Sequence, residues 1–251
     1  MRTPESNKEW IAWGERDPPW GVASAPGKER GNSAPWTDAE FYALGAQDFA
    51  DYRAFWNSYG LTTDSCVEIG CGAGRMTKQL AQLFGFVHAI DISPAMLDYA
   101  KEHVPDKNIT WHAGSGTQLP IPDQSVTAAF SCHVFQHFSA ESVAYAYFKE
   151  IGRVLKPGGT LLIHLPLIRY HRNEKLRKMS RVLYKIYFMI YQLYGRAARW
   201  RMERGGKLHI HGLSYEERSL AAELSALSSK DISFACKWDE SDPLTVALAR
   251  K

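Results

Sequence analysis

The sequence predicts an α/β protein built on a doubly wound, mostly parallel β-sheet. From Asp64 onward, short runs of β-branched and other apolar residues alternate with helical patterns, which is typical of repeated strand–helix units. A glycine-rich turn joins the first of these runs to the first helix. At the carboxyl end, two further runs separated by turn residues predict a β-hairpin, so one strand of the sheet must be antiparallel.

Five strands are predicted in the central part of the chain, because each is a short apolar run bounded by turn residues. They cover residues 65–70, 87–91, 109–113, 126–133 and 160–166. Helices are predicted between them at residues 75–84, 94–103 and 140–155. The last helix has Ser139 in position to cap its first turn, since a serine hydroxyl can accept from the exposed amides there.

The remaining segments lie around this core. Residues 1–60 form a Trp-rich extension that we expect to become helical over 37–59, and residues 61–251 form the main domain. A helical insertion is predicted at 167–212, after the fifth strand, followed by a helix at 214–227. The hairpin is predicted from strands at 230–238 and 244–251.

Composition places the chain among ordinary globular proteins. Its 251 residues are 45% hydrophobic and 23% charged, enough apolar material for one large core. The first ten residues are charged and lack the apolar stretch of a secretory signal, so we expect a cytoplasmic protein. The cysteines lack both zinc-site spacing and the density of a disulfide scaffold.

Positive charge is concentrated in the insertion. Residues 169–207 contain twelve lysines and arginines against two glutamates, a local charge of +10 in a chain whose net charge is +3. The apolar stretch 182–194 within it is shorter than the roughly 20 residues that cross a bilayer. Two interpretations stay open: peripheral contact with an anionic membrane or acceptor, and a helical lid with a solvated basic face.

The glycine-rich turn has the sequence Glu68-Ile-Gly-Cys-Gly-Ala-Gly74. Gly70 and Gly72 let the backbone approach a ligand, because no Cβ intrudes and the amides at the helix start point outward. Asp91 ends the next strand, seventeen residues after Gly74, where a carboxylate can accept hydrogen bonds from ribose hydroxyls. Together these residues predict a cofactor that contains adenosine.

Glu68 favours one such cofactor over another. The glycine spacing G-x-G-x-G differs from the dinucleotide fingerprint G-x-G-x-x-G. A carboxylate two residues before the first glycine repels a pyrophosphate and attracts the cationic methionine end of S-adenosylmethionine. The sequence therefore favours S-adenosylmethionine.

Four segments in this order resemble the small-molecule class I methyltransferases, which use S-adenosylmethionine and release S-adenosyl-L-homocysteine. They are VEIGCGAGRMTKQLA, AIDISPAMLDYA, LPIPDQSVTAAFSCHVFQHF and FKEIGRVLKPGGTLLIHLP, and the resemblance spans about residues 61–166. It implies a Rossmann-like sheet of seven strands whose last strand is antiparallel, in agreement with the predicted hairpin.

The resemblance also implies roles for individual residues. Glu68, Gly70, Cys71 and Gly72 would line the methionine part of the cofactor, Asp91 would hold the ribose, and Ile92 and Met96 would lie against the adenine. Gly74, Gly116 and Ser131 are assigned to the same site. Two positions depart from the family pattern: Ser115 stands where an acid often binds the adenine amino group, and Thr127 stands where an aspartate is frequent at the start of the fourth strand.

Histidines at the strand ends predict the acceptor side. Methyl transfer mainly requires alignment of the acceptor and exclusion of water, and a hydroxyl acceptor gains from a general base with a pKa near neutrality. His133 and His137 follow the fourth strand and His164 ends the fifth, which brings all three to the ligand crevice of a parallel sheet. His137 is our first choice as base, and each of the three also fits a purely structural role.

We therefore expect O-methylation of a small-molecule, sugar or lipid-linked acceptor by an S-adenosylmethionine-dependent enzyme. An RNA or tRNA methyltransferase is the main alternative, but nucleic acid is disfavoured because residues 131–135 read SCHVF and lack the Asn/Asp-Pro-Pro-aromatic motif. A non-catalytic cofactor-binding partner is the other alternative. No metal is expected, since His209 and His211 have no third ligand near them in the sequence.

Overall fold

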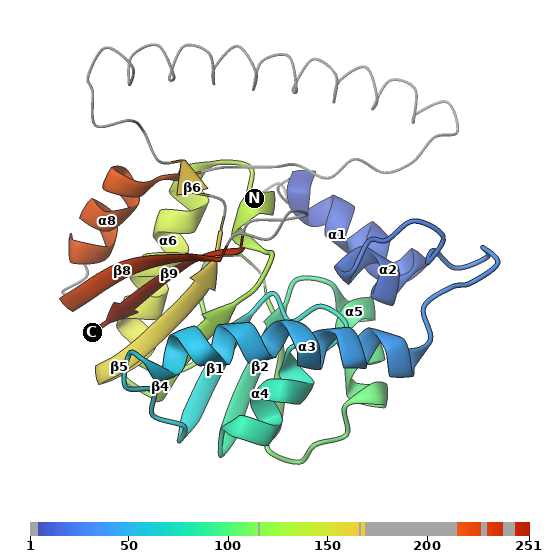
Figure 1. Ribbon diagram of the computed structural model, residues 1–251, viewed down its shortest axis with the longest axis horizontal. Coiled ribbons are helices and arrows are strands. Elements are labelled where there is room, and N and C mark those ends of the chain that lie inside the picture. The colour runs from blue at the N-terminus through green and yellow to red at the C-terminus, as the bar shows by residue number, and fades with distance from the viewer. Residues whose placement is uncertain (1–4, 115, 166, 169–214, 227–229, 238–243) are drawn as a thin grey trace, which may run out of the picture.

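The computed structural model describes residues 5–114, 116–165, 167–168, 215–226, 230–237 and 244–251 (Figure 1). A seven-stranded sheet lies at its centre, in the strand order β3-β2-β1-β4-β5-β9-β8. The parallel strands are β1 (Ser65–Ile69), β2 (Phe86–Asp91), β3 (Ile109–Ala113), β4 (Val126–Ser131) and β5 (Leu155–His164). Beside β5, β9 (Leu244–Arg250) runs antiparallel to both β5 and β8 (Lys230–Lys237). The predicted α/β, Rossmann-like fold with a parallel sheet is confirmed.

Helices cover both faces of this sheet, because alternate residues of a strand point to opposite sides. Phe130 of β4 and Leu162 of β5 pack with α3 (Asp38–Asn57) and α4 (Thr77–Leu83). Their neighbours Ala129 and Ile163 pack with α6 (Glu141–Val154) and α8 (Glu217–Ala226). Figure 1 shows α3 lying across one face, with α4 beside it.

The short elements complete the arrangement. A fifth helix, α5 (Pro94–His103), connects β2 to β3. Ahead of α3 lie α1 (Glu5–Arg16) and α2 (Pro18–Val22), and α1 packs against α5. A 3-10 turn, η1 (Phe135–His137), follows β4. A separate pair of parallel strands is formed by β6 (Leu167–Ile168) and β7 (Tyr215–Glu216).

Most predicted elements form, with changes at their ends. α5 begins and ends as predicted, since Ser93 accepts from the Met96 amide and Pro94 occupies the first turn. β4 ends at Ser131, two residues early, and His133 beyond it has a φ of 57° that does not continue a strand. The prediction that Ser139 caps α6 is wrong, because Ala140 is the N-cap residue and makes no side-chain cap bond.

Several predicted features lie outside the described residues. They are Ser115, the basic segment 169–207 with most of the insertion 167–212, and the histidines His209 and His211. Among the described helices, none combines the length and apolar character needed to cross a membrane.

The strand order predicts a ligand crevice beside β1. After β1 the chain moves outward through β2 and β3, and it then returns to place β4 on the other side of β1. The loops that follow β1 and β4 therefore diverge, and ligands of open α/β sheets bind in the crevice between such loops. The Ser131 hydroxyl donates to the carbonyl of Ile69 at 2.8 Å, which holds the two strand ends together at this point.

Candidate functional site

The glycine turn is fastened to the neighbouring strand. The amides of Gly70 and Cys71 both donate to the carbonyl of Ile90 in β2, at 2.8 and 3.0 Å. Gly70 and Gly72 have φ values of 74° and 51°, which side chains rarely tolerate. A Cβ would lie 2.3 Å from a methyl group of Val134 at the first position and 2.6 Å from one of Val22 at the second. Only glycine fits here, because Val134 and Val22 lie against the turn.

Asp91 lies against this turn at the end of β2. One carboxylate oxygen accepts from the amide of Gly72 at 2.8 Å and the other from the amide of Ser93 at 2.9 Å. Burial raises the pKa of Asp91, and these amide hydrogen bonds oppose that shift without cancelling it. The Ile92 amide is a third donor to this carboxylate, which has roughly four lone-pair sites. Asp91 can therefore accept a further hydrogen bond from a ligand hydroxyl while it holds the turn in place.

Glu68 is a buried acid beneath the turn. Its side chain is 2% exposed and accepts from the Thr77 hydroxyl at 2.6 Å. Burial, aided by the nearby Asp91, raises the pKa of Glu68 to about 8, although the Thr77 hydrogen bond and Arg75 act in the opposite direction. A cation placed beside Glu68 would favour its charged form. Thr77, which begins α4, is a functional neighbour that the sequence reasoning missed.

Other predicted cofactor residues have packing or positioning roles in this structure. Met96 is 2% exposed and clusters with Trp13 and Phe41. A Cβ on Gly74 would lie 3.1 Å from Ala100, so this glycine allows the turn to approach α5. Their predicted contacts with the cofactor remain predictions.

Three more of the predicted cofactor residues, Cys71, Ile92 and Gly116, also have contacts within the protein. Cys71 is buried among Ala89 and Leu97, and burial raises the pKa of its thiol. Ile92 is half-buried, and a Cβ added to Gly114 would lie 3.5 Å from its side chain. The carbonyl of Gly116 accepts from the Tyr147 hydroxyl at 2.8 Å, which ties the loop after β3 to α6.

The three predicted histidines gather at the ends of β4 and β5. The backbone amide of His133 donates to Nδ1 of His164 at 3.3 Å, and the two rings lie 4.2 Å apart. Burial, with the charges of His133 and His137, holds the pKa of His164 well below its usual value, so this ring is neutral at physiological pH. His137 ends η1, where its ring lies 4.8 Å from that of Trp10 in α1.

A cysteine and a tyrosine that the sequence reasoning did not select adjoin these histidines. The thiol of Cys132 donates to the Tyr52 hydroxyl at 3.1 Å, and the Tyr52 ring lies 6.1 Å from that of His164. Burial raises the pKa of Cys132, but His133, Arg75 and Tyr52 outweigh this effect, and the net shift is downward. Cys132, His133 and His164 bring potential metal-ligand atoms within 4.8 Å of one another.

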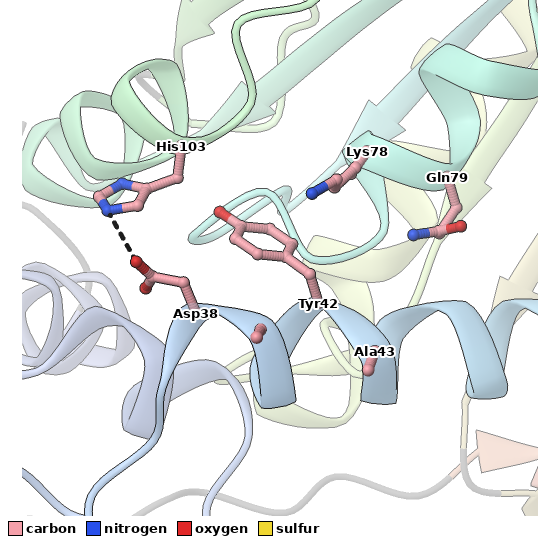
Figure 2. Close-up of a pocket in the computed structure, with 7 residues that line it drawn as sticks. Asp38, Tyr42, Ala43, Lys78, Gln79 and His103 are labelled. Carbon is pink, nitrogen blue, oxygen red and sulfur yellow. Dashed lines mark ion pairs between the residues drawn. The ribbon is translucent and has the colours of Figure 1, made fainter.

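A separate hollow of about 450 Å³ is lined by residues of α3, α4 and α5 (Figure 2). Tyr42 of α3 forms one wall, with its hydroxyl bonded to the carbonyl of Ala73 at 3.0 Å and Lys78 above its ring. His103 and Asp38 close one side through an ion pair at 3.4 Å. None of the predicted cofactor or histidine residues lines this hollow, so the crevice beside β1 remains the candidate site.

Comparisons with known proteins agree with this fold. Residues 67–163 match the family described as a methyltransferase domain. A demethylmenaquinone methyltransferase from Tropheryma whipplei (strain Twist) is 34% identical over 119 residues, which is 47% of this chain and 48% of the relative. A malonyl-[acyl-carrier protein] O-methyltransferase from Hahella chejuensis is 33% identical over 98 residues, or 38% and 34% of the two chains. The chain thus spans about half, or less, of the length of these curated relatives.

Among solved structures, the N-methyltransferase NodS from Bradyrhizobium japonicum WM9, in complex with S-adenosyl-L-homocysteine, has a similar fold. The TM-score is 0.56 at 15% identity, with 98% of each chain covered. The α/β fold of this protein is thus one that a methyltransferase with bound S-adenosyl-L-homocysteine also has. The match of residues 67–163 to the methyltransferase-domain family confirms the resemblance inferred from the sequence.

Proposed function

We propose that the protein transfers a methyl group from S-adenosylmethionine to a hydroxyl oxygen of a small-molecule, sugar or lipid-linked acceptor. The observation that carries this proposal is the gathering of His133, His137 and His164 beside the glycine turn. One relative is named for demethylmenaquinone, which supports a lipid-linked acceptor, and another for O-methylation of malonyl-[acyl-carrier protein], which supports transfer to oxygen. Peripheral contact of residues 169–207 with an anionic membrane remains part of the proposal.

The residues around the turn fit the proposed cofactor. Glu68 provides a carboxylate for the ammonium group of the methionine part, and its raised pKa means that a bound cation would be accompanied by loss of a proton. Gly70 and Gly72 have no Cβ to separate the backbone of the turn from a ligand, and in this structure Val134 and Val22 lie against them. Asp91 has acceptor capacity left for a ribose hydroxyl beside the three backbone amides that donate to it.

The histidines would divide the work on the acceptor. When bound, S-adenosylmethionine supplies an electrophilic methyl group whose bond to sulfur breaks as the new bond to oxygen forms. His137 would receive the proton that leaves the acceptor hydroxyl. His164 is 4% exposed, and its Nδ1 is occupied by the amide of His133, so it is better suited to position its neighbours than to exchange protons with solvent.

The amino-terminal helices would help to exclude water from this site. Trp10 of α1 contacts the ring of His137, and Val22 at the end of α2 lies over Gly72. One short segment therefore covers both the acceptor side and the cofactor side of the crevice. We assign the N-terminal extension this role as a lid.

The test compares His137→Ala with His103→Ala, a control histidine at the end of α5. Formation of S-adenosylhomocysteine is measured with a short-chain prenylated hydroquinone and a simple phenol as acceptors. We expect His137→Ala to lower the rate by ~10²-fold or more at neutral pH, with cofactor affinity unchanged and a smaller loss as pH rises toward the pKa of the acceptor hydroxyl. Full turnover by His137→Ala at every pH would remove it from the mechanism, and a product methylated on carbon or nitrogen would overturn O-methylation.

A further inference from the structure

Three side chains with metal-binding atoms meet where β4 and β5 end. The strand register pairs Ser131 with Ile163, so the next residue on each strand places Cys132 level with His164. His133 follows in a left-handed conformation with a φ of 57°, and its ring lies beside that of His164. The potential ligand atoms of the three residues all lie within 4.8 Å of one another.

The donor set is that of a borderline-soft divalent metal. One sulfur and two imidazole nitrogens suit zinc, whereas magnesium and calcium require oxygen ligands. Catalytic zinc sites commonly have three protein ligands and one open position. Zinc–ligand bonds of about 2.0–2.3 Å place the ligand atoms of a tetrahedral site about 3.5 Å apart. The three atoms would need to approach by about 1 Å, a shift within reach of side-chain rotations, since Cys132 and His133 are only partly buried.

The neighbouring groups would support such a site. The Tyr52 hydroxyl, 3.1 Å from the sulfur of Cys132, can donate to a thiolate once the thiol has lost its proton. Tyr52 itself is 2% exposed, so its position is fixed by the core. Nδ1 of His164 accepts from the His133 amide and therefore carries the lone pair of the neutral ring. Binding of a metal to this nitrogen would break its 3.3 Å hydrogen bond with the His133 amide.

The cluster also adjoins the cofactor crevice. Ser131, one residue before Cys132, donates to the carbonyl of Ile69 directly ahead of the glycine turn. Val134, one residue after His133, lies against Gly70. A ligand in the open coordination position would therefore lie near the turn that we assign to the methionine part of the cofactor.

We propose that Cys132, His133 and His164 bind one zinc ion, whose open coordination position takes the hydroxyl oxygen of the methyl acceptor. The role in acceptor binding rests on the proposed function, whereas zinc binding itself does not. Coordination to zinc lowers the pKa of a hydroxyl or thiol. This identifies the acceptor class as one that carries an ionisable hydroxyl able to ligate a metal. The proposal replaces our expectation from the sequence that no metal binds.

Cobalt(II) is the probe for the test, added to the full chain after removal of metals with a chelator. We expect one equivalent to bind, with a thiolate-to-cobalt charge-transfer band in the near ultraviolet and the intense visible bands of a tetrahedral site. Zinc should displace it. Cys132→Ser should abolish the charge-transfer band, and His164→Ala should weaken zinc binding by at least ~100-fold. Tyr52→Phe, which removes only the hydroxyl near the sulfur, should weaken it by about 10-fold.

His88→Ala is the matched control, because His88 forms a separate histidine pair with His112 at 3.0 Å on β2 and β3. It should leave the cobalt spectrum unchanged. Calorimetry with S-adenosylhomocysteine shows that each variant remains folded. Absence of the charge-transfer band from the wild type, or its persistence in Cys132→Ser, overturns the zinc site. Full methylation by the metal-free protein overturns the metal's role but leaves the proposed function intact. Cobalt binding without methylation of any acceptor supports the metal site but overturns the proposed function.

Discussion

Replacement of Gly70 by alanine should destabilise the fold through two separable effects. The φ of 74° at Gly70 is a left-handed conformation, which costs a residue with a Cβ about 1–2 kcal/mol. The new Cβ would also lie 2.3 Å from a methyl group of Val134, and overpacking of this kind costs about 1–3 kcal/mol. Together these terms predict a loss of about 2–5 kcal/mol in the free energy of unfolding.

Two further variants separate the terms. Gly158 has a φ of 80°, and a Cβ there would meet no atom within 4 Å, so Gly158→Ala measures the backbone cost alone, about 1–2 kcal/mol. Val134→Ala in the Gly70→Ala background removes the overpacking and should restore about 1–3 kcal/mol. Denaturant titration measures all three. If Gly70→Ala costs no more than Gly158→Ala, Val134 does not pack on the turn and our account of the crevice wall is incorrect.

The remaining predictions concern two acidic residues, Asp91 and Glu68. Asp91→Asn should weaken S-adenosylmethionine binding by about 1–3 kcal/mol, because it removes charge-assisted hydrogen bonds; unchanged affinity by calorimetry would mean that the ribose is held elsewhere. The pKa of Glu68 is raised from 4.5 to about 8 in the folded protein, so its stabilising contribution is complete below pH 4.5 and is lost as pH rises toward 8. The free energy of unfolding should fall over this interval in the wild type and fall less in Glu68→Gln, and parallel pH profiles would contradict the burial argument.

Local signals in the sequence predicted the strands and the open turn. The Ser93-Pro94 pair marks the start of a helix on its own, and the glycines of residues 70–74 mark a turn between a strand and a helix. Asp91 could be assigned to the same crevice because parallel strands end at the same edge of a sheet. These inferences depend only on neighbours in sequence and on the general geometry of α/β sheets.

The roles of Met96 and Cys132 depended on contacts between distant segments. Met96 is covered by α1 and α2, as the close approach of Gly14 and Gly21 to it shows, and no local pattern predicts where those helices pack. Cys132 meets His164 only through the register between β4 and β5, which includes an irregularity between Val126 and Ala128. A shift of one residue would have turned the two side chains to opposite faces of the sheet.

The contacts of α1 and α2 have a consequence for the order of events during turnover. The single stretch of residues 7–22 reaches Gly72 at one end and His137 through Trp10 at the other. Departure of either the cofactor or the methylated product should therefore disturb the packing of α1 and α2 over the other ligand. Exchange of spent cofactor and release of product would then be coupled steps, and the rate at which these two helices loosen would set an upper limit on the number of catalytic cycles per second.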